Sequence, residues 1–311
     1  CRLVDRLLCR DPEDRPRSAR TLIEEIARRR RTVSLALADT GGGLPLLATG
    51  VVGRTDLVEA VTEVVSGRLG GDTLPAGPPA LVVLRGEPGA GRSTVAAEAL
   101  RQLQLRVAEG RLPTFAHAAG PRLSLAAASA LGRTGSPPVD DAALIRWVSD
   151  LEAAVADRAL VLVLEDGDAD QRVLRRLAAL LRRDPALQLG RLALVVRASE
   201  ETPLEADGLG LDRVVPPLTR GEVSELAHRA LGSQAPAAFV TQLLQVSRGL
   251  PALVHECLRA AWEQQGDRQR VVEADLSALS GAGLSSLAGA RVARLSAADQ
   301  RLVHGVAVAA R

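Results

Sequence analysis

The sequence predicts an α/β protein, in which a parallel β-sheet flanked by helices is followed by an all-helical lid subdomain. Continuous apolar runs typical of buried strands occur at 80–84 (ALVVL), 159–164 (ALVLVL) and 192–196 (LALVV). Helical patterns separate these runs, as expected when crossover helices cover both faces of a parallel sheet. From Thr219 onward the apolar residues recur with helical spacing, which predicts helices only.

Composition supports a folded, aliphatic protein. The chain has 311 residues, of which 47% are hydrophobic and 24% charged, so it has room for about two domains. All 39 basic residues are Arg, and only two Trp and two Phe are present. So few aromatic side chains cannot form a base-stacking platform, and a net charge of +2 is too balanced for a basic footprint. We therefore expect no direct nucleic-acid binding.

The cysteines indicate a reducing compartment, and the hydropathy pattern indicates that the chain does not span a membrane. The three cysteines, Cys1, Cys9 and Cys257, form no C-x-x-C pair, so neither a disulfide framework nor a zinc site is predicted. A cytoplasmic location without membrane contact is expected, because no uncharged apolar run reaches the ~18–20 residues of a membrane span. The chain begins without Met and stops in an apolar helical run, so we expect both ends to continue in a longer protein.

The spacing of apolar residues in 1–31 predicts two amphipathic helices, joined by a turn that contains two prolines. The pattern L-L-x-x-D-P-x-x-R-P-x-S-A, from Leu7 to Ala19, resembles the end of the C-terminal lobe of a serine/threonine protein kinase. The resemblance implies that Arg15 pairs with a Glu upstream of Cys1. The catalytic parts of a kinase are missing, so this segment alone cannot be one. The residues also allow an unrelated helical hairpin.

A linker is predicted at 32–50, which is polar and contains three consecutive glycines. The α/β core is then assigned to 51–218, and the lid with the start of a further helical module to 219–311. The core is expected to contain helices at Thr55–Val65, Ser93–Val107, Asp140–Ala156 and Asp170–Arg182, and further strands near Leu112–Ala116 and at Arg213–Val215. The lid is expected to contain helices at Thr219–Leu231, Pro236–Val246, Pro251–Gln264 and Ala290–Ala310.

The first strand leads into a glycine-rich loop and then a helix, in the pattern G-x-x-x-x-G-[K→R]-S. Its residues are Gly86, Glu87, Pro88, Gly89, Ala90, Gly91, Arg92, Ser93 and Thr94. Glycines let backbone N–H groups turn toward phosphate oxygens, the helix N-terminus adds its dipole, and a Ser hydroxyl reaches Mg²⁺. The pattern predicts a P-loop NTPase sheet that binds ATP with Mg²⁺. A glycine-rich turn without a ligand is the alternative.

Arg92 stands where the motif has Lys. A guanidinium keeps the positive charge but is planar, wider and forked, whereas the ammonium of Lys is compact. We therefore expect weak or absent hydrolysis, and expect Arg92→Lys to raise it.

Two acids follow the strand at 159–164. Glu165 is predicted to hold Mg²⁺ through the water shell of the ion, with Ser93 as the second metal residue, and Asp166 to orient the attacking water. The side chains of Glu87, Asp168 and Asp170 are expected to be solvated loop groups.

These pieces together resemble the STAND branch of AAA+ P-loop ATPases, the signalling ATPases that are often attached to kinases or transcription regulators. The resemblance spans about 51–311 and is carried by VGRTD at 52–56, GEPGAGRST at 86–94, LVLVLED at 160–166, LVVR at 194–197, VPPLT at 215–219 and GLP at 249–251. It implies that Arg197 senses the γ-phosphate, and that Pro251 and Arg54 contact the nucleotide. The chain departs from the family at Arg92, in the short segment after the acids, and in the Ala-rich region 112–131.

The function expected is an ATP-binding regulatory switch in a multidomain signalling protein, with ATP or ADP, flanking kinase and C-terminal effector domains, and other proteins as partners. Nucleotide-dependent self-association is a further expectation. Two alternatives remain, a nucleotide-free scaffold for protein interactions and a truncated active kinase. ATPase activity is left open by the sequence.

Overall fold

The computed structural model describes residues 51–70, 79–131, 141–157, 159–184, 189–202, 210–265 and 270–279, with short pieces between 286 and 303. The predicted kinase-like helices at 1–31 and the linker at 32–50 lie outside the described residues. Most of the helix predicted at 290–310 lies outside them as well.

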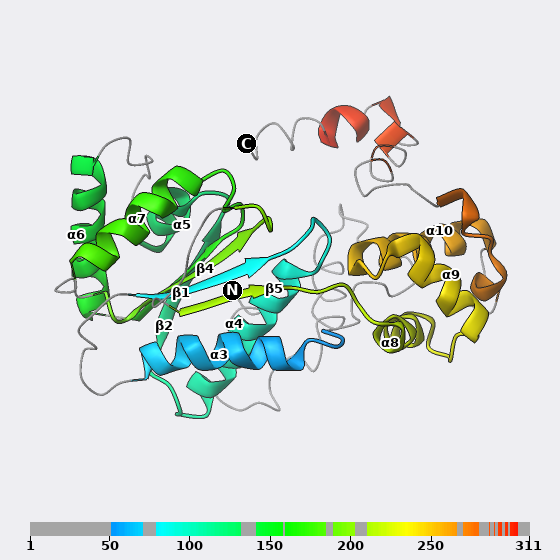
Figure 1. The fold of residues 1–311 in the computed structure, drawn as a ribbon, viewed down its shortest axis with the longest axis horizontal. Coiled ribbons are helices and arrows are strands. Elements are labelled where there is room, and N and C mark those ends of the chain that lie inside the picture. The colour runs from blue at the N-terminus through cyan, green and yellow to red at the C-terminus, as the bar shows by residue number, and fades with distance from the viewer. Residues whose placement is uncertain are drawn as a thin grey trace, which may run out of the picture. The chain divides into compact units, whose positions relative to one another are not determined.

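A five-stranded parallel sheet forms the centre of the α/β core, in the order β2-β3-β4-β1-β5 (Figure 1). Its strands are β1 (Ala80–Arg85), β2 (Phe115–Gly120), β3 (Ala159–Leu164), β4 (Leu192–Ala198) and β5 (Gly210–Val214). Val82 of β1 pairs with Val195 of β4 on one side and with Leu211 of β5 on the other. Because every pairing is parallel, the carboxyl ends of these strands meet at one edge, where ligands of open α/β sheets bind.

Helices cover both faces of the sheet. They are α3 (Thr55–Leu69), α4 (Arg92–Ala108), α5 (Leu123–Leu131), α6 (Asp141–Asp157) and α7 (Gln171–Arg183). Alternate residues of β3 enter two different hydrophobic clusters: Leu160, Leu162 and Leu164 pack in the cluster of α5, α6 and α7, while Val161 and Val163 pack in that of α3 and α4. This two-sided burial explains why the strand reads as an unbroken apolar run.

The helical lid follows the sheet. It consists of α8 (Arg220–Leu231), α9 (Ala237–Ser247) and α10 (Pro251–Gln265), with short 3₁₀ turns η2 (Val271–Glu273) and η3 (Ser277–Leu279). A reciprocal capping box between Thr219 and Glu222 starts α8.

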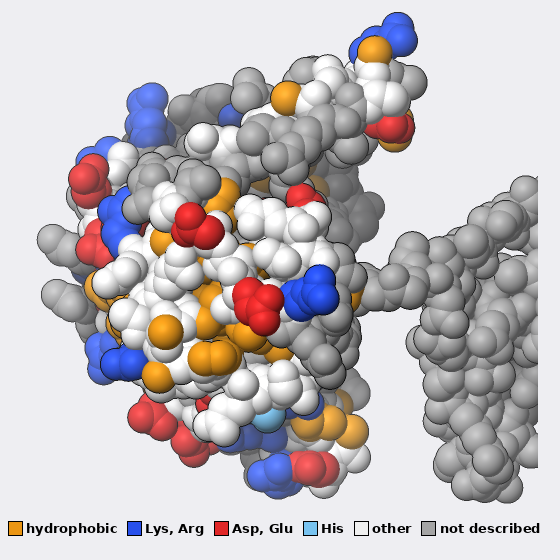
Figure 2. Space-filling model, turned by 90° about the vertical axis from the view of Figure 1, so that its right-hand side faces the viewer, with side chains coloured by type: hydrophobic (Ala, Val, Ile, Leu, Met, Phe, Trp, Pro, Cys, Tyr) orange, Lys and Arg blue, Asp and Glu red, His pale blue; other side chains and the backbone are white. Residues whose placement is uncertain are grey.

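On the side of the molecule in Figure 2, hydrophobic side chains gather in the middle and most charged ones lie toward the edge.

The predicted fold class, a parallel sheet flanked by helices and followed by a helical lid, is confirmed. Within the described part of the chain, no helix is both long and apolar enough to cross a membrane.

Two local predictions were wrong, and one helix was missed. The strand predicted at 112–116 lies at 115–120, and helix α5 at 123–131 was not predicted. β2 is an edge strand whose residues are Ala-rich and only partly buried, so it has no continuous apolar run. The last strand begins at Gly210 rather than at Arg213. A Cβ at Gly210 would lie 2.2 Å from the Leu81 carbonyl oxygen, so glycine permits a close backbone approach that periodicity does not reveal.

Candidate nucleotide-binding site

The loop between β1 and α4 has the backbone shape that a phosphate site needs. Gly86, Gly89 and Gly91 have φ values of 144°, 90° and 95°, a region that favours glycine. The Ala90 amide donates to the Glu87 carbonyl at 3.0 Å and closes the turn. Gly91 occupies the N-cap position of α4 and has no side chain to cap it. The first amides of α4 therefore face the loop without a side-chain acceptor, which suits an anion.

Arg92 is the first residue of α4, and its Nη1 donates to the Ala198 carbonyl at the end of β4. Burial lowers the pKa of Arg92. The neighbouring Arg197 cation lowers this pKa as well, while Asp168 and Asp166 oppose the shift. The residue in the lysine position is therefore anchored on the neighbouring strand.

Arg197, near the end of β4, joins two residues predicted to bind the metal. Its Nη1 donates to Ser93 Oγ, and its Nη2 donates to the Glu165 carbonyl at 2.9 Å. The same Nη2 lies 3.9 Å from Glu165 Oε2. Arg197 Nε is buried and has no hydrogen-bond partner among the described residues. The structure thus brings Arg197, Ser93 and Glu165 together beside the loop.

The acids after β3 have different surroundings. Asp166 is exposed, and its Oδ1 accepts from the Ala169 amide at 3.1 Å. Asp170 is only 5% exposed and accepts from the Leu123 amide at 2.5 Å, at the start of α5. The expectation that Asp170 is a solvated loop group is therefore wrong. Sequence could not reveal it because the partner lies in the helix that was not predicted.

Asp168 is exposed but not merely solvated, since its carboxylate accepts from the Ser199 amide at 3.1 Å and from the hydroxyls of Ser199 and Thr202. Burial by itself raises the pKa of Asp168. The hydrogen bonds from Thr202 and Ser199, helped by the Arg92 cation, outweigh burial and hold that pKa below its ordinary value. Asp168 therefore fixes the segment that follows β4, and Arg197 lies near the end of that strand. Glu87 is exposed, as expected.

The lid touches the loop through the start of α10. The Ala252 amide donates to the Gly89 carbonyl at 3.3 Å. Pro251 Cγ lies 3.6 Å from the position that a Cβ on Gly91 would take. The Leu218 amide donates to the Gly249 carbonyl at 2.7 Å, which fixes the turn before α10. Pro251 is thus placed at the loop, and its contact with a nucleotide remains a prediction.

Arg54 lies at the connection between core and lid. It is 6% exposed, and its Nη2 donates to the Pro216 carbonyl at 2.6 Å. Burial lowers the pKa of Arg54, and Glu222 opposes that shift. A Cβ on Gly53 would collide with the Glu222 side chain, so the segment before α3 packs closely against the start of α8. Arg54 therefore lies where the α/β core meets the helical lid.

Mg²⁺ requires near-octahedral oxygen ligands at about 2.0–2.1 Å. The predicted ligands Ser93 and Glu165 are both in contact with the Arg197 guanidinium. A cation hydrogen-bonded to the ligand oxygen repels a second cation there. The residues in this arrangement do not fit a divalent ion between Ser93 and Glu165.

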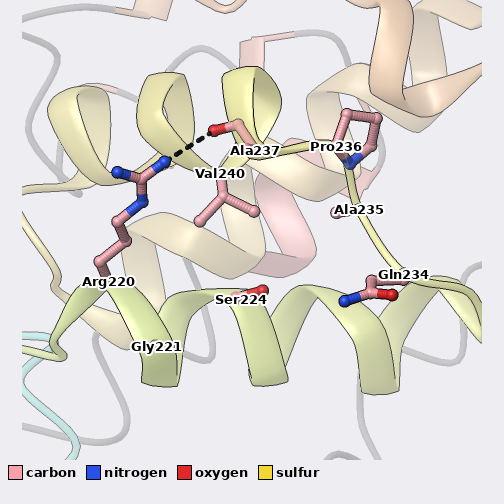
Figure 3. A pocket seen from close by; sticks show the side chains of 8 residues that line it. All are labelled: Arg220, Gly221, Ser224, Gln234, Ala235, Pro236, Ala237 and Val240. Atoms are coloured by element: carbon pink, nitrogen blue, oxygen red, sulfur yellow. Dashed lines mark hydrogen bonds between the residues drawn. The ribbon is translucent and has the colours of Figure 1, made fainter.

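A separate cavity of about 610 Å³ opens in the lid between α8 and the start of α9 (Figure 3). It is lined by Arg220, Gly221, Ser224, Gln234, Ala235, Pro236, Ala237 and Val240. Arg220 Nη2 donates across it to the Ala237 carbonyl at 3.4 Å. None of the phosphate-loop residues lines this cavity, and no sequence pattern predicted it.

Solved structures of other proteins align with this fold. Drosophila ORC bound to DNA aligns with a TM-score of 0.52 and 17% identity, over 84% of this chain and 68% of that one. The Aeropyrum pernix ORC1 protein in complex with DNA aligns with a TM-score of 0.51 and 20% identity, over 73% and 67%. The Aeropyrum pernix ORC2 protein in its ADPNP-ADP complexes aligns with a TM-score of 0.50 and 18% identity, over 76% and 70%.

No family model matches the chain, and no curated protein matches it in sequence. Identities this low support the fold alone. The fold shared with these structures is a parallel sheet flanked by helices and followed by a helical region.

Proposed function

We propose that the chain is a nucleotide-binding regulatory module that binds ATP or ADP at residues 86–94. One observation carries this proposal: three glycines with positive φ precede α4 at the carboxyl edge of the sheet. That geometry aims backbone amides and a helix N-terminus at one point, where polyphosphate oxygens find donors and a favourable dipole. The ADPNP-ADP complexes of the structurally similar Aeropyrum pernix ORC2 protein are consistent with it.

The lid gives this site a means of regulation. The start of α10 rests on the loop through the contact between Ala252 and Gly89, so a ligand at the loop also meets the lid. Nucleotide can shift the lid only if it binds two lid arrangements with different affinities. A STAND-type switch of this kind would alter the exposure of flanking modules, here a kinase segment before the core and an effector after it, or would drive self-association.

Hydrolysis is proposed to be slow or absent. Arg92 is bound to the Ala198 carbonyl, and its forked head does not reproduce the compact ammonium that the phosphate loop normally supplies. The Asp166 carboxylate accepts from the Ala169 amide of its own loop. Both side chains therefore already have hydrogen-bond partners in the backbone of the protein.

A nucleotide-free scaffold is the second candidate, and it has its own observation. Arg92 and Arg197, the two cations beside the loop, already have protein acceptors in Ala198, Ser93 and Glu165. Because these hydrogen bonds form without any ligand, they are compatible with a scaffold that binds no nucleotide. The expectation that this segment does not bind nucleic acid directly remains a prediction. DNA is bound to the Drosophila ORC and Aeropyrum pernix ORC1 proteins in those structures, and we do not extend this binding to the present chain.

Titration with a fluorescent ATP analogue separates the two candidates. The proposal predicts saturable binding by the wild type and loss of binding in Arg92→Glu, because a carboxylate then faces the phosphates. Arg213→Glu is the matched control, since Arg213 is exposed on β5 and donates to the Asp212 carbonyl. Thermal melting checks that each variant is folded. If the wild type does not bind even at millimolar analogue, the scaffold is the better account.

A further inference from the structure

A guanidinium group lies between the two predicted metal ligands. Arg197 donates to Ser93 Oγ and to the Glu165 carbonyl, and approaches the Glu165 carboxylate to 3.9 Å. The Arg197 side chain is 17% exposed, so it is held within the site rather than extended into solvent. Ser93 and Glu165, the two residues predicted to hold Mg²⁺, therefore both contact the Arg197 guanidinium.

We infer that the Arg197 guanidinium takes the place of the divalent cation, so that nucleotide binds at this loop without Mg²⁺. The inference rests on the proposed nucleotide site and concerns how the phosphate charge is neutralised there. Arginine pairs well with phosphate because it offers up to five N–H donors in a planar fork. With two of its nitrogens directed to Ser93 and Glu165, the group is already positioned at the start of α4.

The second cation strengthens this interpretation. Arg92 lies close enough to Arg197 for the two charges to oppose each other, since Arg197 contributes to lowering the pKa of Arg92. A polyphosphate between them would relieve this repulsion and form charge-assisted hydrogen bonds. The loop therefore has two protein cations beside it, and the contact between Arg197 and Ser93 blocks the position where a metal would add a third.

The test compares nucleotide affinity in excess Mg²⁺ and in EDTA, with ADP titrated calorimetrically into the purified chain. For the wild type, the Kd should differ by less than about threefold between the two solutions. Arg197→Ala frees Ser93 and Glu165, so its binding should become metal-dependent, with a Kd at least about tenfold weaker in EDTA than in Mg²⁺. Arg213→Ala, the control at an exposed arginine, should behave as the wild type.

A second variant keeps the test independent of how well Arg197→Ala folds. Ser93→Ala removes the hydroxyl that a metal would need. Its effect on ADP affinity should be equal in Mg²⁺ and EDTA, whereas a metal-bound serine would matter only in Mg²⁺.

The results distinguish failure of the inference from failure of the proposed function. A wild-type Kd that weakens at least about tenfold in EDTA overturns the inference and leaves the nucleotide site intact. A folded Arg197→Ala that stays insensitive to metal with unchanged affinity also overturns it. No ADP binding in either solution contradicts the proposed function itself.

Discussion

The turn before α10 gives the most quantitative prediction, through the substitution Gly249→Ala. Gly249 has a φ of 75°, and a Cβ there would lie 2.5 Å from the Leu218 carbonyl oxygen and 3.1 Å from Pro217 Cβ. The Leu218 amide also donates to the Gly249 carbonyl at 2.7 Å. The methyl group must push this turn away from the core–lid connection, and the start of α10 then moves away from the phosphate loop.

The expected cost has two parts. Placing a non-glycine residue in the left-handed region costs about 1–2 kcal/mol. Losing the hydrogen bond between Leu218 and Gly249 adds about 1 kcal/mol. The free energy of unfolding should therefore fall by about 2–3 kcal/mol, which for a chain of 311 residues lowers Tm by roughly 3–5 °C.

Thermal and urea unfolding measure this change, with Gly221→Ala as the matched control. A Cβ at Gly221 in α8 has no heavy atom within 4 Å, so that variant should be unchanged or more stable by up to about 1 kcal/mol. ADP affinity should fall in Gly249→Ala and stay constant in Gly221→Ala. If the two variants unfold within about 0.5 kcal/mol of each other, the close approach at Gly249 has been misread.

Three further predictions concern single side chains. Arg92→Lys should raise ATP turnover, and equal or lower turnover at matched folding would defeat the explanation of weak hydrolysis. Because the pKa of Asp168 is lowered from 3.8 in the folded protein, its contribution to stability is present above that value and lost as the pH falls through its folded pKa. Asp168→Asn should flatten the fall in urea-measured stability below about pH 4, and an unchanged slope would contradict this. Burial, with Glu256, raises the pKa of Cys257 to about 11. At pH 8 only about one thiol in a thousand is ionised, so peptide mass spectrometry should find Cys257 alkylated after unfolding but not before.

Strongly periodic segments made the sheet predictable. β1, β3 and β4 are buried on both faces and carry only aliphatic residues over most of their length, so their composition alone marks them as central parallel strands. The glycines of the loop at 86–94 were equally clear in the sequence, and each adopts a positive φ that favours glycine. The edge strands were placed less well, since each pairs on one side only and mixes small, polar and exposed residues.

Side-chain partners were the part that sequence could not supply. The sequence predicted that Ser93 and Glu165 bind a metal and that Arg197 contacts a phosphate. In the structure, Arg197 contacts both Ser93 and Glu165. Such pairings depend on where β4 ends relative to α4, a relation that no local pattern encodes. Arg54 and Asp170 are similar cases, because their partners at Pro216 and Leu123 are distant in the chain.

The central claim, that nucleotide binds at the loop and meets the lid at α10, is tested most directly by hydrogen–deuterium exchange with and without ADP. The account predicts slower exchange in peptides covering 86–94 and 249–254, because the ligand orders the loop amides and the start of α10 together. Peptides from α6, which contributes to the other face of the sheet, should not change. Unchanged exchange at 86–94 in saturating ADP would contradict the account.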